Sequence, residues 1–125
     1  MTVSGTWYSG AGSKLELHEN GSELTGTFDS TENPGGGSFE VHGSIDPDGT
    51  RPNRALAFSV AWIDGSTPSE DRSVTSYTGQ YHHSDLDGGD VIQVVFLLAN
   101  ETPPKKAYAS VFVGSDVFRR IGPLS

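Results

Sequence analysis

Arg72-Ser-Val-Thr-Ser-Tyr-Thr-Gly-Gln-Tyr81 is the stretch that decides how the rest of the chain is interpreted. Successive side chains of a β-strand point to opposite faces, so Ser73, Thr75 and Tyr77 would share one face of a strand here. A row of small hydroxyls that ends in an aromatic ring is poor material for an ordinary core. It suits a concave wall that holds a ligand with a polar head and an apolar body. The alternative is a half-exposed strand that is simply rich in Ser and Thr.

The composition indicates one all-β domain over residues 1–125. The chain is long enough for a single core, and its 16 Gly and 7 Pro separate runs of aromatic and β-branched residues. A formal charge of −8 argues against nucleic acid or an anionic membrane as a partner, because both need clustered Lys and Arg. No apolar run approaches the roughly 20 residues of a membrane helix. With no Cys, disulfides and thiolate metal sites are excluded.

Period-two alternation predicts eight strands along the chain. They are residues 5–9, the stretch around Leu15 and Leu17 before the Asn20-Gly21 hairpin turn, and residues 23–30, 38–46, 54–62, 72–81, 90–99 and 106–114. The Gly-rich segment 31–38 is expected to be a flexible loop, and residues 115–121 a short turn of helix.

No segment shows a sustained helical period, and short turns connect the strands. Sequential antiparallel strands of this number make an eight-stranded antiparallel up-and-down β-barrel, which can enclose one small ligand.

The alternation also predicts which side chains face the interior. The polar ones are Ser9, Ser13, Ser30, Ser73, Thr75 and Asp116, and the apolar ones include Trp62, Tyr77, Phe96 and Leu98. Buried hydroxyls need hydrogen-bond partners, because an unpaired one costs roughly 1–3 kcal/mol. Either these groups bond one another and water, or they await a ligand.

Six short motifs carry a family resemblance over nearly the whole chain. They are Gly5-Thr-Trp-Tyr8, Leu24-Thr-Gly-Thr-Phe-Asp-Ser30, Ser59-Val-Ala-Trp62, Thr78-Gly-Gln-Tyr81, Phe96-Leu-Leu98 and Val113-Gly-Ser-Asp116. In this order and spacing they resemble the avidin and streptavidin family of biotin-binding proteins. The resemblance implies the same barrel, non-catalytic binding of biotin, and a secreted or periplasmic protein.

The resemblance further implies a role for each matching position. The ureido carbonyl of biotin would accept hydrogen bonds at Ser9, Ser13 and Phe28. The two ureido N–H groups would donate hydrogen bonds at Asp116, Thr75 and Ser30. Thr75 would also lie near the ring sulfur. The aromatic enclosure of the bicyclic body would come from Trp62, Tyr77 and Phe96, with Leu98 beside them. Ser73 would help to hold the carboxylate, the loop after residue 30 would close over the ligand, and Tyr108 would reach the site of a neighbouring subunit.

Several of these positions depart from the family pattern. Asn is usual at the position of Ser9 and Tyr at that of Phe28, and Phe28 cannot donate a hydrogen bond. Tyr77, Phe96 and Tyr108 replace residues that are often Trp. We therefore expect weaker binding than in the family prototypes.

Other signals are weaker, and alternatives stay open. Asp85, Asp87 and Asp90 resemble a calcium loop but lack a following ligand Glu, so we expect a polar turn and no metal or cofactor. The apolar outer face of residues 91–97, together with Tyr108, favours a homotetramer over a dimer. The alternatives to biotin binding are a lipocalin-like carrier of another small molecule and a barrel that has lost its ligand and serves as an interaction module.

Overall fold

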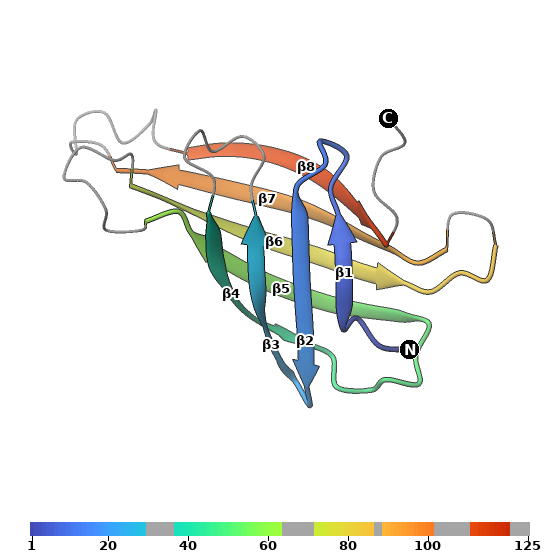
Figure 1. Cartoon of the computed structure of the whole chain (residues 1–125). Coiled ribbons are helices and arrows are strands. Elements are labelled where there is room, and N and C mark those ends of the chain that lie inside the picture. Colours follow the sequence, from blue (N-terminus) through green and yellow to red (C-terminus); the bar gives the residue numbers. More distant parts are fainter. Residues whose placement is uncertain (30–36, 64–71, 87–88, 102–110, 121–125) are drawn as a thin grey trace.

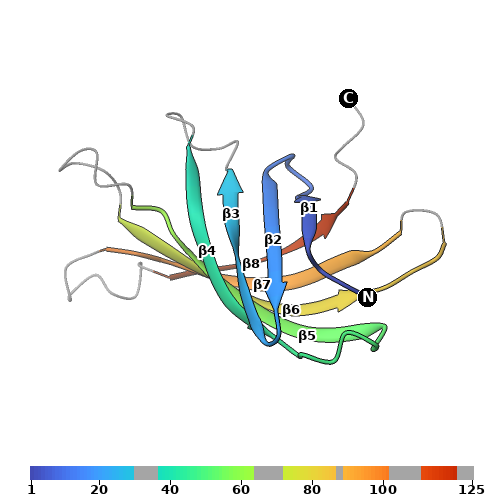
Figure 2. The same cartoon turned by 60° about the horizontal axis from the view of Figure 1, so that its bottom comes forward.

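The computed structural model is a closed antiparallel barrel whose strands follow one another in sequence order (Figures 1 and 2). It describes residues 1–29, 37–63, 72–86, 89–101 and 111–120. Within them the strands are β1 (Gly5–Tyr8), β2 (Lys14–Asn20), β3 (Glu23–Asp29), β4 (Ser38–Ile45), β5 (Asn53–Ala61), β6 (Ser73–His82), β7 (Val91–Asn100) and β8 (Val111–Arg119). The predicted eight-stranded up-and-down barrel is confirmed, and none of the described residues forms a helix that could span a membrane.

The strands of the barrel differ in length. The ten-residue strands β6 and β7 pair from Ser73 opposite Asn100 to His82 opposite Val91. By contrast, β1 has four residues, and within the described part of the chain it pairs with β8 only where Tyr8 lies opposite Arg119. The pairing that closes the barrel, between β1 and β8, is therefore the one with the fewest residue pairs.

The predicted alternation is confirmed in the decisive strand, β6. Thr75 and Tyr77 are buried in the interior, while Val74, Ser76 and Thr78 are exposed outside. Every strand contributes a buried side chain to the same core, among them Trp7, Leu15, Leu24, Val41, Val60, Tyr77, Ile92 and Phe118. The Asn20-Gly21 hairpin is also confirmed, with Gly21 at a φ of 63° that favours glycine.

The C-terminal part differs from the prediction. We expected a strand over residues 106–114 and a turn of helix over 115–121, but β8 continues to Arg119. Asp116 lies opposite Val94, and Phe118 lies opposite Ile92 with its side chain fully buried. The reason is that β7 needs a second neighbour to complete its hydrogen bonds, and only a straight strand here closes the barrel. Residues 102–110 and 121 lie outside the described part.

One end of the barrel is closed by a buried ion pair that the sequence did not reveal. The Arg54 side chain is 0% exposed and donates to both carboxylate oxygens of Glu19, at 2.9 and 2.7 Å. Its remaining N–H groups donate to the carbonyls of Met1 and Asp46. The hydrogen bonds from Arg54 lower the pKa of Glu19 to about 2. This network joins the N-terminal segment, β2 and the start of β5.

A second polar cluster lies at the same end, around Asp90. Its carboxylate accepts hydrogen bonds from the Tyr81 hydroxyl at 2.9 Å and the Ser84 N–H at 3.1 Å, and His83 Nδ1 lies 2.8 Å away. Burial, and then the contact with Asp90, raises the pKa of Tyr81 to about 12. Arg120 also reaches Asp90 and lies 4.1 Å over the ring of Trp7. We call the end that carries Arg54 and Asp90 the plugged end.

Candidate functional site

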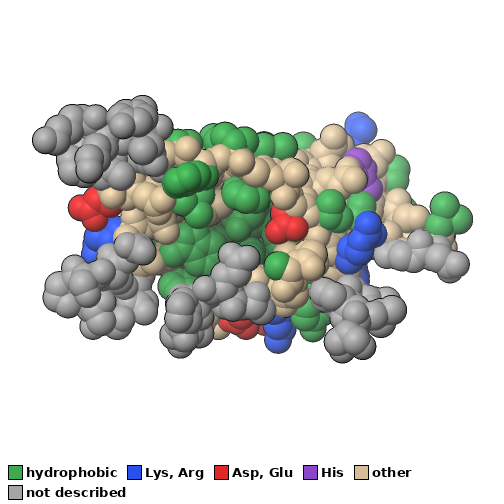
Figure 3. All heavy atoms as spheres, turned by 90° about the horizontal axis from the view of Figure 1, so that it is seen from above, with side chains coloured by type: hydrophobic (Ala, Val, Ile, Leu, Met, Phe, Trp, Pro, Cys, Tyr) green, Lys and Arg blue, Asp and Glu red, His purple; other side chains and the backbone are tan. Residues whose placement is uncertain are grey.

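The opposite end of the barrel gathers most of the residues predicted from the sequence. Odd-numbered strands end there and even-numbered strands begin there, so residues far apart in the chain become neighbours. Figure 3 looks down on the side where β1 and β3 finish and shows hydrophobic side chains gathered in its middle. The predicted residues at this open end are Ser9, Ser13, Phe28, Trp62, Ser73, Thr75, Tyr77, Phe96, Leu98 and Asp116. Ser30, Tyr108 and most of the expected loop over the ligand lie outside the described residues.

An aromatic wall occupies the interior beneath this opening. Trp62 meets the edges of Phe28 and Phe39, each at a ring distance of 5.2 Å. Tyr77 stacks on Phe58 at 4.8 Å and on Phe28 at 6.0 Å. Edge-to-face and offset arrangements of this kind hold the rings in place. Phe28 is therefore a buried part of the wall, with no polar atom to offer a ligand.

Sequence reasoning missed two rings of this wall and one ring beneath it. Phe39 lies directly opposite Phe28 in the pairing of β3 and β4, Phe58 shares the inner face of β5, and Phe118 shares that of β8 with Asp116. Each has the correct alternation for the interior, so the signal was present. What the sequence lacked was the register that brings the rings into contact.

A tight turn holds Ser9 and Ser13 at the rim of the wall. The Ser9 N–H donates to the Ser13 carbonyl at 2.9 Å, and the Ser13 N–H donates to Ser9 Oγ at 3.0 Å. Ser9 is only 4% exposed. Because Ser9 Oγ is used as an acceptor and no described residue accepts its hydrogen, the Ser9 hydroxyl keeps a donor for the site.

Thr75 is arranged in the same way from the other side of the barrel. The indole N–H of Trp62 donates to Thr75 Oγ1 at 2.7 Å. Thr75 is 2% exposed, and among the described residues nothing accepts its hydroxyl hydrogen. Accepting one bond polarises the hydroxyl and strengthens it as a donor. The predicted pair Trp62 and Thr75 is thus brought into direct contact.

Asp116 supplies the complementary acceptor. It lies on the inner face of β8, half-buried, and its Oδ1 accepts a 2.8 Å hydrogen bond from the N–H of Val117. No donor from the described residues reaches its other carboxylate oxygen. The open end therefore combines two hydroxyl donors, one carboxylate acceptor and an aromatic wall, which suits a ligand that has both a polar head and an apolar body.

The described histidines do not take part in this site. His18 and His42 are exposed on the outside of the barrel, whereas His82 contacts Asn53 and His83 contacts Asp90 at the plugged end. Within the part of the chain that the structure describes, no three metal-ligating side chains come together. Asp87 of the expected Asp85–Asp90 turn lies outside the described residues.

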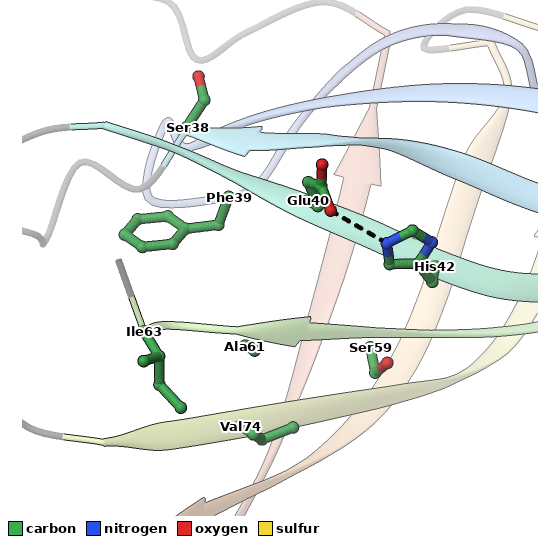
Figure 4. A pocket seen from close by; sticks show the side chains of 8 residues that line it. All are labelled: Ser38, Phe39, Glu40, His42, Ser59, Ala61, Ile63 and Val74. Atoms are coloured by element: carbon green, nitrogen blue, oxygen red, sulfur yellow. Dashed lines mark hydrogen bonds and ion pairs between the residues drawn. The ribbon is translucent and has the colours of Figure 1, made fainter. Parts of the chain in front are cut away.

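A groove of about 450 Å³ lies on the outside of the barrel (Figure 4). Glu40, His42 and Val74 point outward on β4 and β6, and the Glu40 carboxylate is 3.3 Å from His42 Nε2. The lining residues are Ser38, Phe39, Glu40, His42, Ser59, Ala61, Ile63 and Val74. Only Phe39 is shared with the aromatic wall, so this groove is separate from the interior site.

Comparison with known proteins agrees with the barrel and with the motifs along it. The sequence matches the family model described as "Avidin family" over residues 1–121. That match spans every described strand, from β1 to β8. The resemblance inferred from the six motifs is confirmed, and the chain belongs to the avidin family, a family of non-enzymatic binding proteins.

Proposed function

We propose that this protein binds biotin non-covalently inside the barrel and catalyses no reaction. The observation that carries the proposal is the pair of buried hydroxyls, Ser9 and Thr75, each held as an acceptor by the framework with its hydrogen unused by the described residues. Together with family membership, this favours a ligand that offers acceptors at two places. Biotin does so, with its ureido carbonyl and its ring sulfur.

In this proposal the ureido group lies between Ser9 and Asp116. Its carbonyl accepts from Ser9 and Ser13, and one N–H donates to the free oxygen of Asp116. Charge-assisted bonds are the stronger class, and a carboxylate on the N–H polarises the carbonyl further. Thr75 faces the sulfur. The other N–H donates to Ser30. Trp62, Tyr77, Phe96 and Leu98 enclose the bicyclic body, together with Tyr108 from a neighbouring subunit, and Ser73 helps to hold the carboxylate.

Binding should be weaker than in family members that have a tyrosine at the position of Phe28. The ring of Phe28 fills the wall but adds no donor to the ureido carbonyl. A preorganised barrel still spends little free energy on reorganisation when it binds. We therefore propose specific binding of moderate to high affinity.

Thermal unfolding with and without biotin is the direct test. A ligand bound only by the native state raises its stability in proportion to the logarithm of its concentration over Kd. A clear rise with biotin supports the proposal. A rise only with unrelated apolar ligands would favour the lipocalin-like carrier, and no rise with any of them would favour the interaction module.

Calorimetry on two matched variants then tests the site. Thr75→Val removes the buried hydroxyl and should weaken biotin binding by about 1 kcal/mol or more. Thr78→Val removes an exposed hydroxyl from the outer face of the same strand and should leave affinity unchanged. Equal affinities for both variants would contradict the placement of the ligand against Thr75.

The outer face of the barrel leads us to propose a homotetramer. Val95, Leu97 and Val113 are 55%, 50% and 70% exposed. Leu97 lies opposite Val113 in the pairing of β7 and β8, so these side chains form one apolar surface. Solvent-facing surfaces of this kind usually mark an interface. A secreted or periplasmic location, typical of the family, completes the proposal.

A further inference from the structure

Phe96 and Gly114 lie directly opposite each other on the inner face of β7 and β8, the two neighbouring strands at the top of Figure 1. A Cβ atom added to Gly114 would lie 2.8 and 3.0 Å from Cε1 and Cε2 of Phe96, and closer still to Cζ. All three atoms belong to the outer end of the ring. The ring of Phe96 therefore rests across the Cα atom of Gly114, in space that any other residue would fill.

Backbone conformation does not explain this glycine. Gly114 does not adopt a positive φ, so another residue could follow the same backbone path. Gly26 and Gly79 differ, because an added Cβ there would meet the backbone of the neighbouring strand. At Gly114 the three nearest atoms all belong to the Phe96 side chain. What this glycine supplies is room for one ring.

That ring borders the interior site on two sides. Phe96 is tilted against Tyr77 at a ring distance of 5.7 Å. Gly114 is two residues before Asp116 on the same face of β8. A ring lifted from Gly114 would move toward the space between Tyr77 and Asp116, where the proposed ligand lies.

We propose that Gly114 is a positioning residue for the interior site: by leaving space over β8, it lets Phe96 lie back and leaves room for the ligand between Tyr77 and Asp116. The inference rests on the proposed binding of biotin and adds a determinant of the size of the site that touches no ligand atom itself. A methyl group at position 114 reduces that room through Phe96.

Calorimetry with biotin on the wild type and four variants tests this inference. Gly114→Ala should weaken binding at least about tenfold, which is the size expected when a methyl group is forced into a packed site. Ser115→Ala, an exposed neighbour on the outer face, should bind as the wild type does. In the Phe96→Leu background the ring atoms are absent, so adding Gly114→Ala should change affinity by less than about twofold.

The readout separates this inference from the proposed function. If the wild type fails to bind biotin, the proposed function is wrong. If the wild type binds and Gly114→Ala binds equally well, or loses the same factor with and without Phe96, the positioning role is wrong. Circular dichroism and the unfolding temperature accompany each variant. Should Gly114→Ala not fold, a folded Phe96→Leu/Gly114→Ala double variant would support the clash with Phe96, and an unfolded one would overturn it.

Discussion

The hydroxyl that Phe28 lacks allows the contribution of one atom to the proposed site to be measured. Its ring contacts Trp62 and Tyr77 and is almost completely buried, yet it has no hydroxyl. Phe28→Tyr would add a hydroxyl donor to the aromatic wall without changing the ring. We expect biotin to bind more tightly by roughly 1–2 kcal/mol, because an additional donor stabilises the polarised carbonyl.

Competition calorimetry of Phe28→Tyr and Phe58→Tyr would measure this effect. Phe58 belongs to the same cluster of rings but stacks behind Tyr77, so its hydroxyl should not improve binding. A neutral or weaker Phe28→Tyr variant would mean that the carbonyl already has its full set of donors or lies elsewhere.

The limits of sequence reasoning are also clearest for single residues. Alternation placed Thr75 and Tyr77 in the interior, because a side-chain period of two is independent of the rest of the fold. Arg54 has the same parity as Phe58 on β5, and the structure buries it on the inner face, where a charge alone would be costly. The distant Glu19 supplies the counter-charge, and no local sequence pattern indicates a partner 35 residues away.

Among the elements, β2 and β5 are joined by this Arg54 and Glu19 pair across the plugged end. The folded-state pKa of Glu19 is about 2, against an ordinary value of 4.5. A depressed pKa contributes stability that is present above about pH 4.5 and is lost as the pH falls toward 2. The loss amounts to roughly 3 kcal/mol of unfolding free energy at most.

Urea unfolding between pH 7 and pH 2.5 would measure that contribution. Glu19→Gln should be less stable by about 3 kcal/mol at pH 7, because it leaves Arg54 buried without its counter-charge. Its stability should then fall less steeply than that of the wild type below pH 4.5. Glu23→Gln, an exposed change on the same hairpin, serves as the control. Parallel pH profiles for Glu19→Gln and the wild type would contradict the assignment.

The element that sequence reasoning misjudged was β8. Its first residues, Val111, Phe112 and Val113, favour a strand. The sequence from Ser115 onward instead suggests a short turn of helix, which does not form. Local preference is weak there, and pairing with β7 decides the conformation. The register between neighbouring strands also determines which aromatic rings touch and which side chains Asp116 faces. Neither can be derived from the alternation of side chains along a single strand.

For the whole molecule, the apolar outer surface around Leu97 and Val113 predicts self-association. Light scattering at micromolar concentration should give a mass near four chains, and Leu97→Glu with Val113→Glu should reduce it. Ser44→Glu introduces a similar charge on the outer face of β4, a strand that does not pair with β7 or β8, and is a useful comparison. A wild-type mass near two chains would exclude the tetramer.

The short contact between β1 and β8 has a consequence for local unfolding. With one residue pair between them, Tyr8 and Arg119, these strands should separate more often than any other neighbours. Ser9 follows β1 and Asp116 belongs to β8, so a ligand held by both crosses that junction. Amide hydrogen exchange should therefore be fastest at β1 in the free protein, and biotin should slow it there more than at β6. Biotin would then stabilise the pairing of β1 with β8, which is the weakest strand pairing of the barrel in the free protein.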